Sequence, residues 1–346
     1  MLLCAEITTL SIGISFKYSN LALPLRRRRR LINFIKFICK NKKVKVKKLK
    51  QRSQSAGNFI ASLIKSVDKS TSETLCNKSE IDLISKHIPT HLKPVTEEEF
   101  GHYLAGLIDG DGHFSKTPQL VIVFNELDAA LAYYIKSRIG YGNVYKVKFK
   151  KAVILVVAKL AGITKVVNLI NGKIRSQNKL DQIKNNILTN NNFKSISDSS
   201  SLSPTINKEV NFNNHWLAGF SDADSSFQIK MLSRHNRIEV RLAFQIDQKN
   251  SDLLILINKF FGGNIGYRKR QDTYYYSSTS FGSAKKVINY FDQFHLLSSK
   301  HVNYLNWRKA YLIIQNKEHL TEPGLVKIYN LKLKKNNCCS SNKLAQ

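Results

Sequence analysis

Two aspartates, Asp111 and Asp224, stand at the same place in a segment that occurs twice in the chain. The first copy reads HYLAGLIDGDGHF over residues 102–114, and the second reads HWLAGFSDADSSF over residues 215–227. Carboxylate oxygens are ligands that Mg²⁺ accepts, and a cation held by carboxylates can activate water for phosphodiester hydrolysis. The repeat therefore predicts a metal-dependent hydrolytic centre, if the fold brings its two copies together.

Each copy carries small residues where one helix could approach another closely: Ala105, Gly106, Ala218 and Gly219. Small side chains let two backbones come together, so we expect the two helices to pack side by side between two halves of the protein. Gly110 and Gly112 are expected to end the first helix in the left-handed conformation. At about 5 Å and an effective dielectric of about 20, two carboxylates at these helix ends would repel each other by roughly 3 kcal/mol, which a divalent cation would offset.

The residues after each copy predict a sheet with covering helices. Apolar and polar residues alternate over 237–247, which predicts a strand with one face under helices and one face open to a partner. The apolar face would carry Ile238, Val240, Leu242, Phe244 and Ile246, and the open face Arg237, Glu239, Arg241, Gln245 and Asp247. In the first half, Tyr145, Val147 and Phe149 are expected to alternate in the same way with Lys146, Lys148 and Lys150. We therefore predict an α+β fold of two pseudo-symmetric αββαββα half-domains with antiparallel sheets.

The charge of the chain favours a polyanionic partner. The 346 residues contain 55 Lys and Arg against 24 Asp and Glu, a formal net charge of +31, which creates a field that attracts nucleic acid. A basic membrane-surface protein is the rival class, but neither a clear amphipathic helix nor a lipidation motif supports it, and no membrane partner is expected. The five cysteines lie outside the two halves and predict neither structural zinc nor a disulfide framework.

Composition divides the chain into six segments. Residues 1–52 form a basic extension, in which fourteen basic residues and no acid lie between Arg26 and Arg52, and self-repulsion predicts that most of it is disordered. The other predicted segments are a linker over 53–97, a first half-domain over 98–188, a second linker over 189–212, a second half-domain over 213–325 and a tail over 326–346.

The first copy of the repeat matches the motif LAGLIDADG at eight of nine positions, from Leu104 to Gly112, and the second copy matches it less fully. The chain thus resembles the LAGLIDADG homing endonucleases, in their two-motif, single-chain form encoded in organellar introns. The resemblance implies sheets that form a saddle for double-stranded DNA, a monomer that uses Mg²⁺ as its divalent cation, and a mitochondrial location with the chloroplast as alternative. It also implies that Asp111 and Asp224 bind the metal and catalyse cleavage, with Gly110 and Ala223 beside them in the metal site.

Further roles follow from the resemblance. Gln248 resembles a glutamine that holds water near the metals, with Glu126 as its counterpart in the first half, and Lys179 and Lys300 resemble basic residues near the scissile phosphates. Asp109 and Asp222 are expected to serve the helix ends. The residues expected to contact DNA are Lys116, Lys146, Lys148, Lys150, Gln228, Lys230, Arg237, Arg241, Gln245, Arg268 and Arg270. Ser225 replaces a glycine of the motif, and if that position required a positive φ, serine would cost on the order of 1 kcal/mol and weaken the second site.

Two alternatives to a DNA endonuclease remain open. An RNA maturase of the same fold would bind its host intron RNA and assist splicing, and a decayed copy would fold without activity. Retention of both motif aspartates favours the endonuclease.

Overall fold

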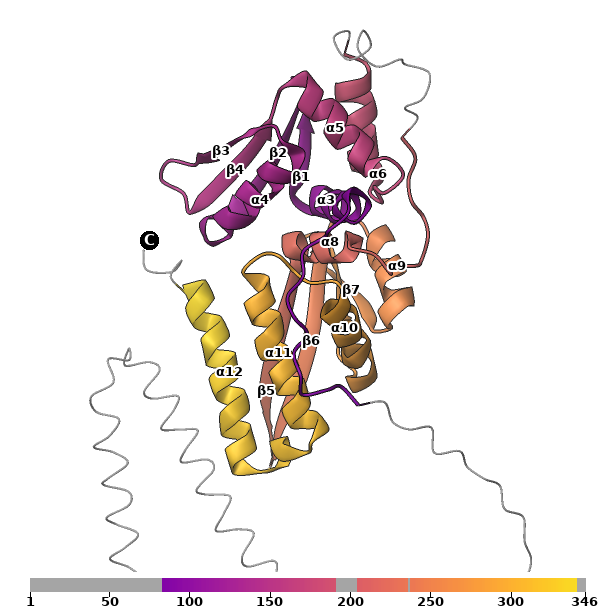
Figure 1. The fold of residues 1–346 in the computed structure, drawn as a ribbon. Coiled ribbons are helices and arrows are strands. Elements are labelled where there is room, and N and C mark those ends of the chain that lie inside the picture. The colour runs from indigo at the N-terminus through magenta and orange to yellow at the C-terminus, as the bar shows by residue number, and fades with distance from the viewer. Residues whose placement is uncertain (1–82, 191–203, 236, 341–346) are drawn as a thin grey trace, which may run out of the picture. The chain divides into compact units, whose positions relative to one another are not determined.

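A computed structural model describes residues 83–190, 204–235 and 237–340 (Figure 1). The first half contains a sheet of four antiparallel strands in the order β1-β2-β4-β3, and the second half repeats that order as β5-β6-β8-β7. Elements of the first half are α3 (Glu97–Asp111), β1 (Gly112–Ser115), β2 (Gln119–Asn125), η1 (Glu126–Asp128), α4 (Ala129–Ile139), β3 (Asn143–Lys146), β4 (Ala152–Val157), α5 (Leu160–Ile170), α6 (Gln177–Gln182) and η2 (Ile183–Leu188). Elements of the second half are α8 (Trp216–Asp224), β5 (Ser225–Arg234), β6 (Arg237–Gln248), α9 (Asp252–Phe261), β7 (Asn264–Arg268), β8 (Thr273–Ser278), α10 (Phe281–Gln293), α11 (Lys300–Gln315), η3 (Glu318–Leu320) and α12 (Glu322–Ser340). The predicted pair of αββαββα units is confirmed.

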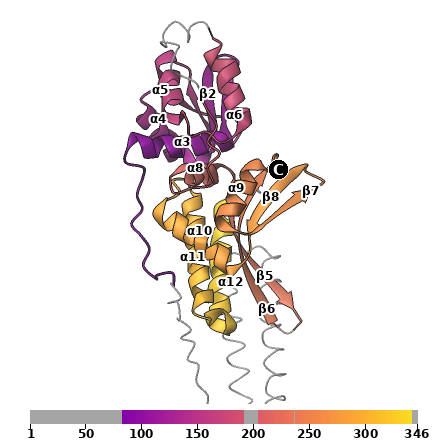
Figure 2. The ribbon, with the colours of Figure 1, turned by 90° about the vertical axis from the view of Figure 1, so that its right-hand side faces the viewer.

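Strand register equates the two sheets residue by residue. Gly112 of β1 lies opposite Ile122 of β2, and Ser225 of β5 lies opposite Ile246 of β6. Because Gly112 and Ser225 hold the same place in the repeat, Ile122 and Ile246 are equivalent positions. The first hairpin of the second half is longer than that of the first half, since β5 has ten residues where β1 has four. Figure 2 shows β5 and β6 as a long hairpin.

Each sheet buries one face under helices. In the first half, Leu120, Ile122 and Phe124 on β2 are buried, and the residues between them are partly or fully exposed. In the second half, Leu242, Phe244 and Ile246 are buried as predicted, while Ile238 and Val240 near the hairpin tip are only partly covered. Strand alternation therefore separates a helix-covered face from an open face in both halves.

The strand predicted over residues 145–150 is wrong in its second part. β3 ends at Lys146, and the chain turns over residues 147–151 before β4. Phe149 takes a φ of +60° in this turn and is fully exposed, and Tyr145 is 53% exposed. These aromatic residues do not form the apolar face that the alternation predicted.

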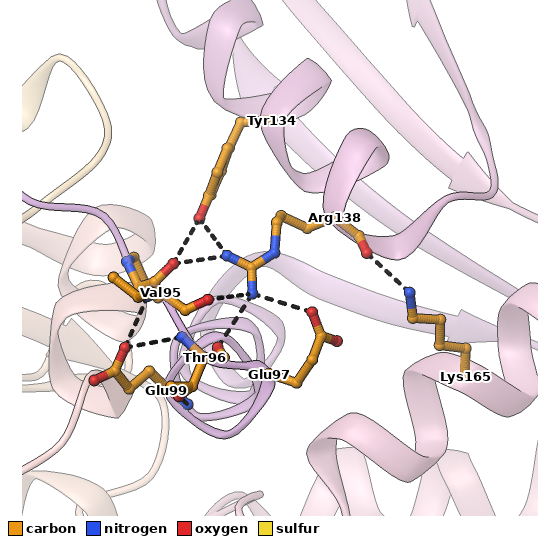
Figure 3. Close-up of polar contacts among 8 residues, drawn as sticks. Val95, Thr96, Glu97, Glu99, Tyr134, Arg138 and Lys165 are labelled. Carbon is orange, nitrogen blue, oxygen red and sulfur yellow. Dashed lines mark hydrogen bonds and ion pairs between the residues drawn. The ribbon is translucent and has the colours of Figure 1, made fainter.

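The start of α3 is held by a capping box and by an arginine (Figure 3). The Thr96 hydroxyl accepts a hydrogen bond from the Glu99 amide, and the Glu99 carboxylate accepts one from the Thr96 amide. Arg138 of α4 donates to the main-chain oxygens of residues 94–96 and pairs with the Glu97 carboxylate at 3.1 Å. The capping box satisfies the amide donors of Thr96 and Glu99 at the helix start, and the Arg138 contacts attach the preceding main chain to α4.

The segment before α3 lies against the second half. Ile84 exchanges two hydrogen bonds with the Gln315 side chain, each of 3.0 Å, and Arg308 donates to the main-chain oxygens of Ser85 and His87 at 3.0 Å. Residues 83–96 were expected to belong to a linker, but these contacts attach them to α11. Most of the expected tail is helical, because α12 includes residues 326–340 and buries Ile328.

Predictions for residues 1–82, 191–203 and 341–346 lie outside the described residues. Among the described helices, none has the length and apolarity that a membrane span requires.

Candidate active site

Two glycines bring the repeated helices α3 and α8 together. A Cβ atom on Gly106 would lie 1.9 Å from the main-chain oxygen of Trp216, and a Cβ on Gly219 would lie 2.0 Å from that of Tyr103. Both distances are far below a van der Waals contact, so each backbone occupies the space that a side chain on the other helix would need. The predicted packing of the small-residue helices is confirmed, and it is reciprocal.

The approach continues to the helix ends, where the acids lie. A Cβ on Gly110 would lie 2.3 Å from the Ala223 Cβ and 3.1 Å from an Asp224 carboxylate oxygen. Gly110 and Ala223 each lie four residues after the close glycines, and residues four apart share one face of a helix. This contact places the last turn of α3 against the last turn of α8, so Asp111 and Asp224 share one site.

The expected left-handed helix ends are wrong. Gly112 has φ −77° and ψ 152°, and Ser225 has φ −91° and ψ 161°, so both residues are extended. Ser225 therefore carries no penalty of the kind that a positive φ would impose. Its hydroxyl instead donates to the main-chain oxygen of Ser221 at 2.8 Å. A Cβ on Gly112 would lie 2.6 Å from the Ile108 Cα, so the need for glycine at residue 112 comes from close packing.

The two carboxylates disfavour each other's charge. Asp111 is exposed at the mouth of the site and Asp224 is half-buried. Partial loss of solvent, together with the nearby Asp224 carboxylate, raises the pKa of Asp111 to about 6. Burial likewise raises the pKa of Asp224, against the lowering effect of Lys300 and of a 2.5 Å hydrogen bond from the Gln248 amide. A cation between these oxygens would relieve the repulsion.

Two lysines lie beside the acids in equivalent positions. Lys300 donates to the Ala223 main-chain oxygen at 2.6 Å, and Lys179 donates to the Gly112 main-chain oxygen. Each ammonium group thus neutralises the exposed carbonyls where a motif helix ends. Burial lowers the pKa of both lysines, and both interact electrostatically with Asp111 and Asp224. The structure therefore brings Lys179, Lys300 and Gln248 together with the two acids.

Asp109 and Asp222 form a second, buried pair that joins the halves. Asp109 accepts hydrogen bonds from the Arg175 amide at 2.8 Å and, across the interface, from the Trp216 indole at 2.9 Å. Asp222 accepts from the Leu297 amide at 2.7 Å and, across the interface, from the Tyr103 hydroxyl at 2.6 Å. Each aspartate therefore ties its own helix end to a following loop and to the other motif helix.

These hydrogen bonds across the interface give a structural role to Tyr103 and Trp216, which were not predicted as site residues from the sequence. Tyr103 and Trp216 hold the same place in the repeat, directly before the motif leucine. Both are fully buried aromatics with a polar group, and both deliver a hydrogen bond to the aspartate of the other helix. A buried aromatic donor repeated at this position was the available signal.

Glu126 is not the counterpart of Gln248. Because Ile122 is equivalent to Ile246, strand register equates Gln248 with Phe124, which is buried and apolar. Glu126 lies two residues further along and pairs with Lys146 at 2.5 Å. The sequence pattern placed the first-half counterpart two residues too late.

The residues expected to contact DNA lie in different settings in the two halves. In the second half, register places Gln228, Lys230, Arg241 and Gln245 on the face away from the helices, where Lys230 and Arg241 are exposed, Gln228 is partly exposed and Gln245 is buried. Arg237 and Arg268 lie near hairpin ends, and Arg270 lies in the turn between β7 and β8. In the first half, Lys116, Lys148 and Lys150 lie in turns, and Lys146 lies opposite Val153, on the helix-covered side of the sheet. The lysine stripe predicted on the first open face is therefore absent from these residues.

Comparison with known proteins gives one family. The family model described as LAGLIDADG endonuclease matches residues 217–311. The chain is 59% identical over 283 residues to an uncharacterized cox1 intron-2 protein of Schizosaccharomyces pombe, covering 82% of this chain and 85% of that protein. It is 28% identical to the intron-encoded DNA endonuclease aI3 of Saccharomyces cerevisiae, over 63% of this chain and 65% of that protein.

Two further likenesses concern function and fold. The chain is 30% identical to the intron-encoded RNA maturase bI4 of Saccharomyces cerevisiae, over 51% of this chain and only 26% of that protein. A solved structure of the I-LtrWI LAGLIDADG homing endonuclease bound to target DNA shares the fold, with a TM-score of 0.55 and 22% identity over 69% of this chain and 98% of that one. With the doubled motif, the paired helices and the extended similarity to intron-encoded relatives, the chain belongs to the LAGLIDADG endonuclease family.

Proposed function

We propose that this protein is a site-specific homing endonuclease that hydrolyses one phosphodiester bond in each strand of a DNA duplex. One observation carries the proposal: Asp111 and Asp224 lie at adjoining helix ends, and Gln248, Lys179 and Lys300 surround them. In a decayed copy, no selection for cleavage would maintain two neighbouring carboxylates whose charges disfavour each other. Similarity to a relative named as a DNA endonuclease supports the same conclusion.

A divalent cation, Mg²⁺ in our proposal, fits this site. Burial and, after it, the nearby Asp224 carboxylate raise the pKa of Asp111, and a cation beside its carboxylate would offset both effects. Within the described part of the chain, no group of three His, Cys, Asp or Glu side chains is placed to hold a metal. Two carboxylates suffice for Mg²⁺, which commonly keeps several waters and takes further ligands from substrate phosphate.

In this proposal, the residues of the site have three roles: holding the cation, orienting a carboxylate and stabilising charge on the phosphates. A bound divalent cation would supply activation of water and stabilisation of the leaving oxygen. Asp111 and Asp224 would hold that cation, and the amide of Gln248 would keep the Asp224 carboxylate oriented. Lys179 and Lys300, already fixed by main-chain oxygens, would offset the charge that develops on the phosphates.

The test uses the full chain and a library of duplexes with randomised sequence, from which bound and cleaved DNA is recovered and its ends are mapped. With Mg²⁺, the wild-type chain is expected to cut both strands of a recovered site. Asp111→Asn and Asp224→Asn are expected to abolish double-strand cleavage and to retain binding, measured by gel shift. Asp181→Asn removes an exposed carboxylate of α6 and serves as the matched control with wild-type cleavage. Full activity of either motif variant would exclude the assigned role.

Salt dependence tests DNA as the partner. Each phosphate that the protein neutralises should contribute about −0.9 to the slope of log K against log salt concentration. We therefore expect binding to weaken steeply between low and moderate salt. A flat profile would contradict a phosphate-binding interface.

RNA maturation is the second candidate function, favoured by the similarity to an RNA maturase over half of this chain. Splicing of the host intron by the Asp111→Asn chain separates the two activities, because a maturase needs the fold without the metal site. We propose a monomer that acts in the mitochondrion, and similarity to a protein named for a cox1 intron supports this location.

A further inference from the structure

The centre of the open face on the first sheet is apolar. On the two central strands, Val121 lies opposite Val156, and Val123 lies opposite Ile154. These residues alternate with buried ones such as Ile122, so all four side chains lie on the face away from the helices. Each is at least partly exposed, and Val123 is 46% exposed. The four side chains form one contiguous patch, which we call the valine patch.

The equivalent positions of the second sheet are polar. Register equates the valine patch with Gln245, Asp247, Tyr275 and Ser277. The Gln245 amide donates to the Asp247 carboxylate at 3.0 Å, and Arg268 pairs with the same carboxylate at 2.7 Å. The second sheet thus presents fixed donors and acceptors where the first sheet presents only methyl groups.

The surroundings of the valine patch match a DNA duplex. β1 begins directly after Asp111, so the open face is continuous with the proposed site of cleavage. Exposed lysines lie in the turns at both ends of the sheet, with Lys116 before β2 and Lys148 and Lys150 before β4. This order, with cations at the ends and apolar groups in the middle, is complementary to phosphates that flank base edges.

We propose that the first sheet reads a thymine-rich half-site through contacts between the valine patch and thymine 5-methyl groups, while the second sheet reads its half-site by hydrogen bonds. This inference rests on the proposed function and assigns the two halves different modes of readout. Thymine alone presents a methyl group in the major groove, and an apolar side chain recognises it without hydrogen bonding. A valine or isoleucine over any other base would cover polar edge atoms and gain no methyl contact in return.

The test replaces thymine by uracil, which removes the methyl group and leaves every hydrogen-bonding atom in place. A site is first recovered from the randomised duplex library with the wild-type chain in the absence of divalent cation. Duplexes with uracil in one half-site at a time are then compared by Kd. We expect about a fourfold rise in Kd for each contacted methyl that is removed in one half-site, and less than about a twofold rise in the other.

A matched pair of variants assigns the effect to the valine patch. Val123→Ala truncates a half-exposed side chain and should reduce the penalty for uracil. Asp247→Ala changes the equivalent position of the second sheet and should leave that penalty intact, while it alters base preference in the other half-site. Circular dichroism confirms that both variants are folded.

The possible failures are distinguishable. Recovery of no specific site would contradict the proposed endonuclease function itself. Recovery of a specific site with no penalty for uracil in either half, or with equal penalties in both, would overturn only the present inference. If Val123→Ala instead converted a dimer into a monomer in sedimentation, the valine patch would be an interface between two copies.

Discussion

The two halves of this protein match closely where they meet and differ where they are open. At the interface, Gly106 and Gly219 exchange the same backbone contact, and Tyr103 and Trp216 donate equivalent crossed hydrogen bonds. On the open sheet faces, equivalent positions carry opposite chemistry, as Val123 and Asp247 illustrate. Under the proposed function, two scissile bonds related by the symmetry of the duplex would require the same chemistry from both halves. The bases of a non-palindromic site would require different side chains from the two sheets.

The reciprocal contact between α3 and α8 predicts that substitution of either close glycine lowers the free energy of unfolding by a similar amount. Gly106→Ala and Gly219→Ala each place a methyl group within about 2 Å of a main-chain oxygen, which only a separation of the helices can relieve. We expect each to lower the free energy of unfolding by about 3 kcal/mol or more. Denaturant unfolding measures this effect.

Gly282→Ala is the matched control for these two variants, because a Cβ there meets nothing within 4 Å and the residue lies in α10. It should be neutral or stabilise by up to about 1 kcal/mol. Markedly unequal losses for Gly106→Ala and Gly219→Ala would contradict a symmetric interface.

The sequence alone revealed this symmetric part because its signals are local. A doubled motif with glycines four residues from Gly110 and Ala223 implies a close helix pair, and the acids follow at its end. The turn between β3 and β4 could not be predicted in the same way. It contains no glycine, proline or asparagine, and the alternation of lysines with Val147 and Phe149 continues through it. Left-handed backbone at a phenylalanine is set by the paired strands, which local propensity cannot anticipate.

Helix ends required three-dimensional information for a related reason. A glycine after a helix usually indicates a left-handed cap, but Gly112 is extended and is restricted by its contact with Ile108. In the second half, Ser221 stands in place of the branched Ile108, so the residue after the helix has room for a side chain. That residue is Ser225, and its hydroxyl donates to the main-chain oxygen of Ser221. The correspondence is visible only when the two halves are compared in the structure.

This difference predicts unequal effects of exchanging the two residues. Gly112→Ser should lower the free energy of unfolding by about 2 kcal/mol, since its Cβ would press against Ile108. Ser225→Gly should cost less than about 1.5 kcal/mol, the value of one neutral hydrogen bond. Cleavage of the two strands should remain balanced in Ser225→Gly, because Ser225 is unstrained. Faster cutting of one strand by Ser225→Gly would show that backbone strain at Ser225 weakens the second site, and would contradict this prediction.

The smallest expected difference between the halves depends on pH. His301 follows Lys300 as Leu180 follows Lys179, so a histidine in the second half replaces a buried leucine in the first. Burial, with His91 and His295 close by, lowers the pKa of His301 to about 4. Asp292, which opposes this shift, is engaged by Arg308 at 2.8 Å.

A histidine with a lowered pKa in the folded state binds a proton more readily when the chain unfolds. Its neutral form therefore contributes stability above the unfolded pKa of about 6.5, and that contribution is lost as the pH falls towards 4. After allowance for its partial exposure, we expect a loss of about 1 kcal/mol from His301 between pH 7 and pH 5. His301→Leu introduces the residue found in the first half and should reduce the difference in the free energy of unfolding between pH 7 and pH 5. Denaturant titrations at both pH values measure this difference. An unchanged profile would show that His301 is already solvated in the folded protein and would contradict its assigned contribution to the pH dependence.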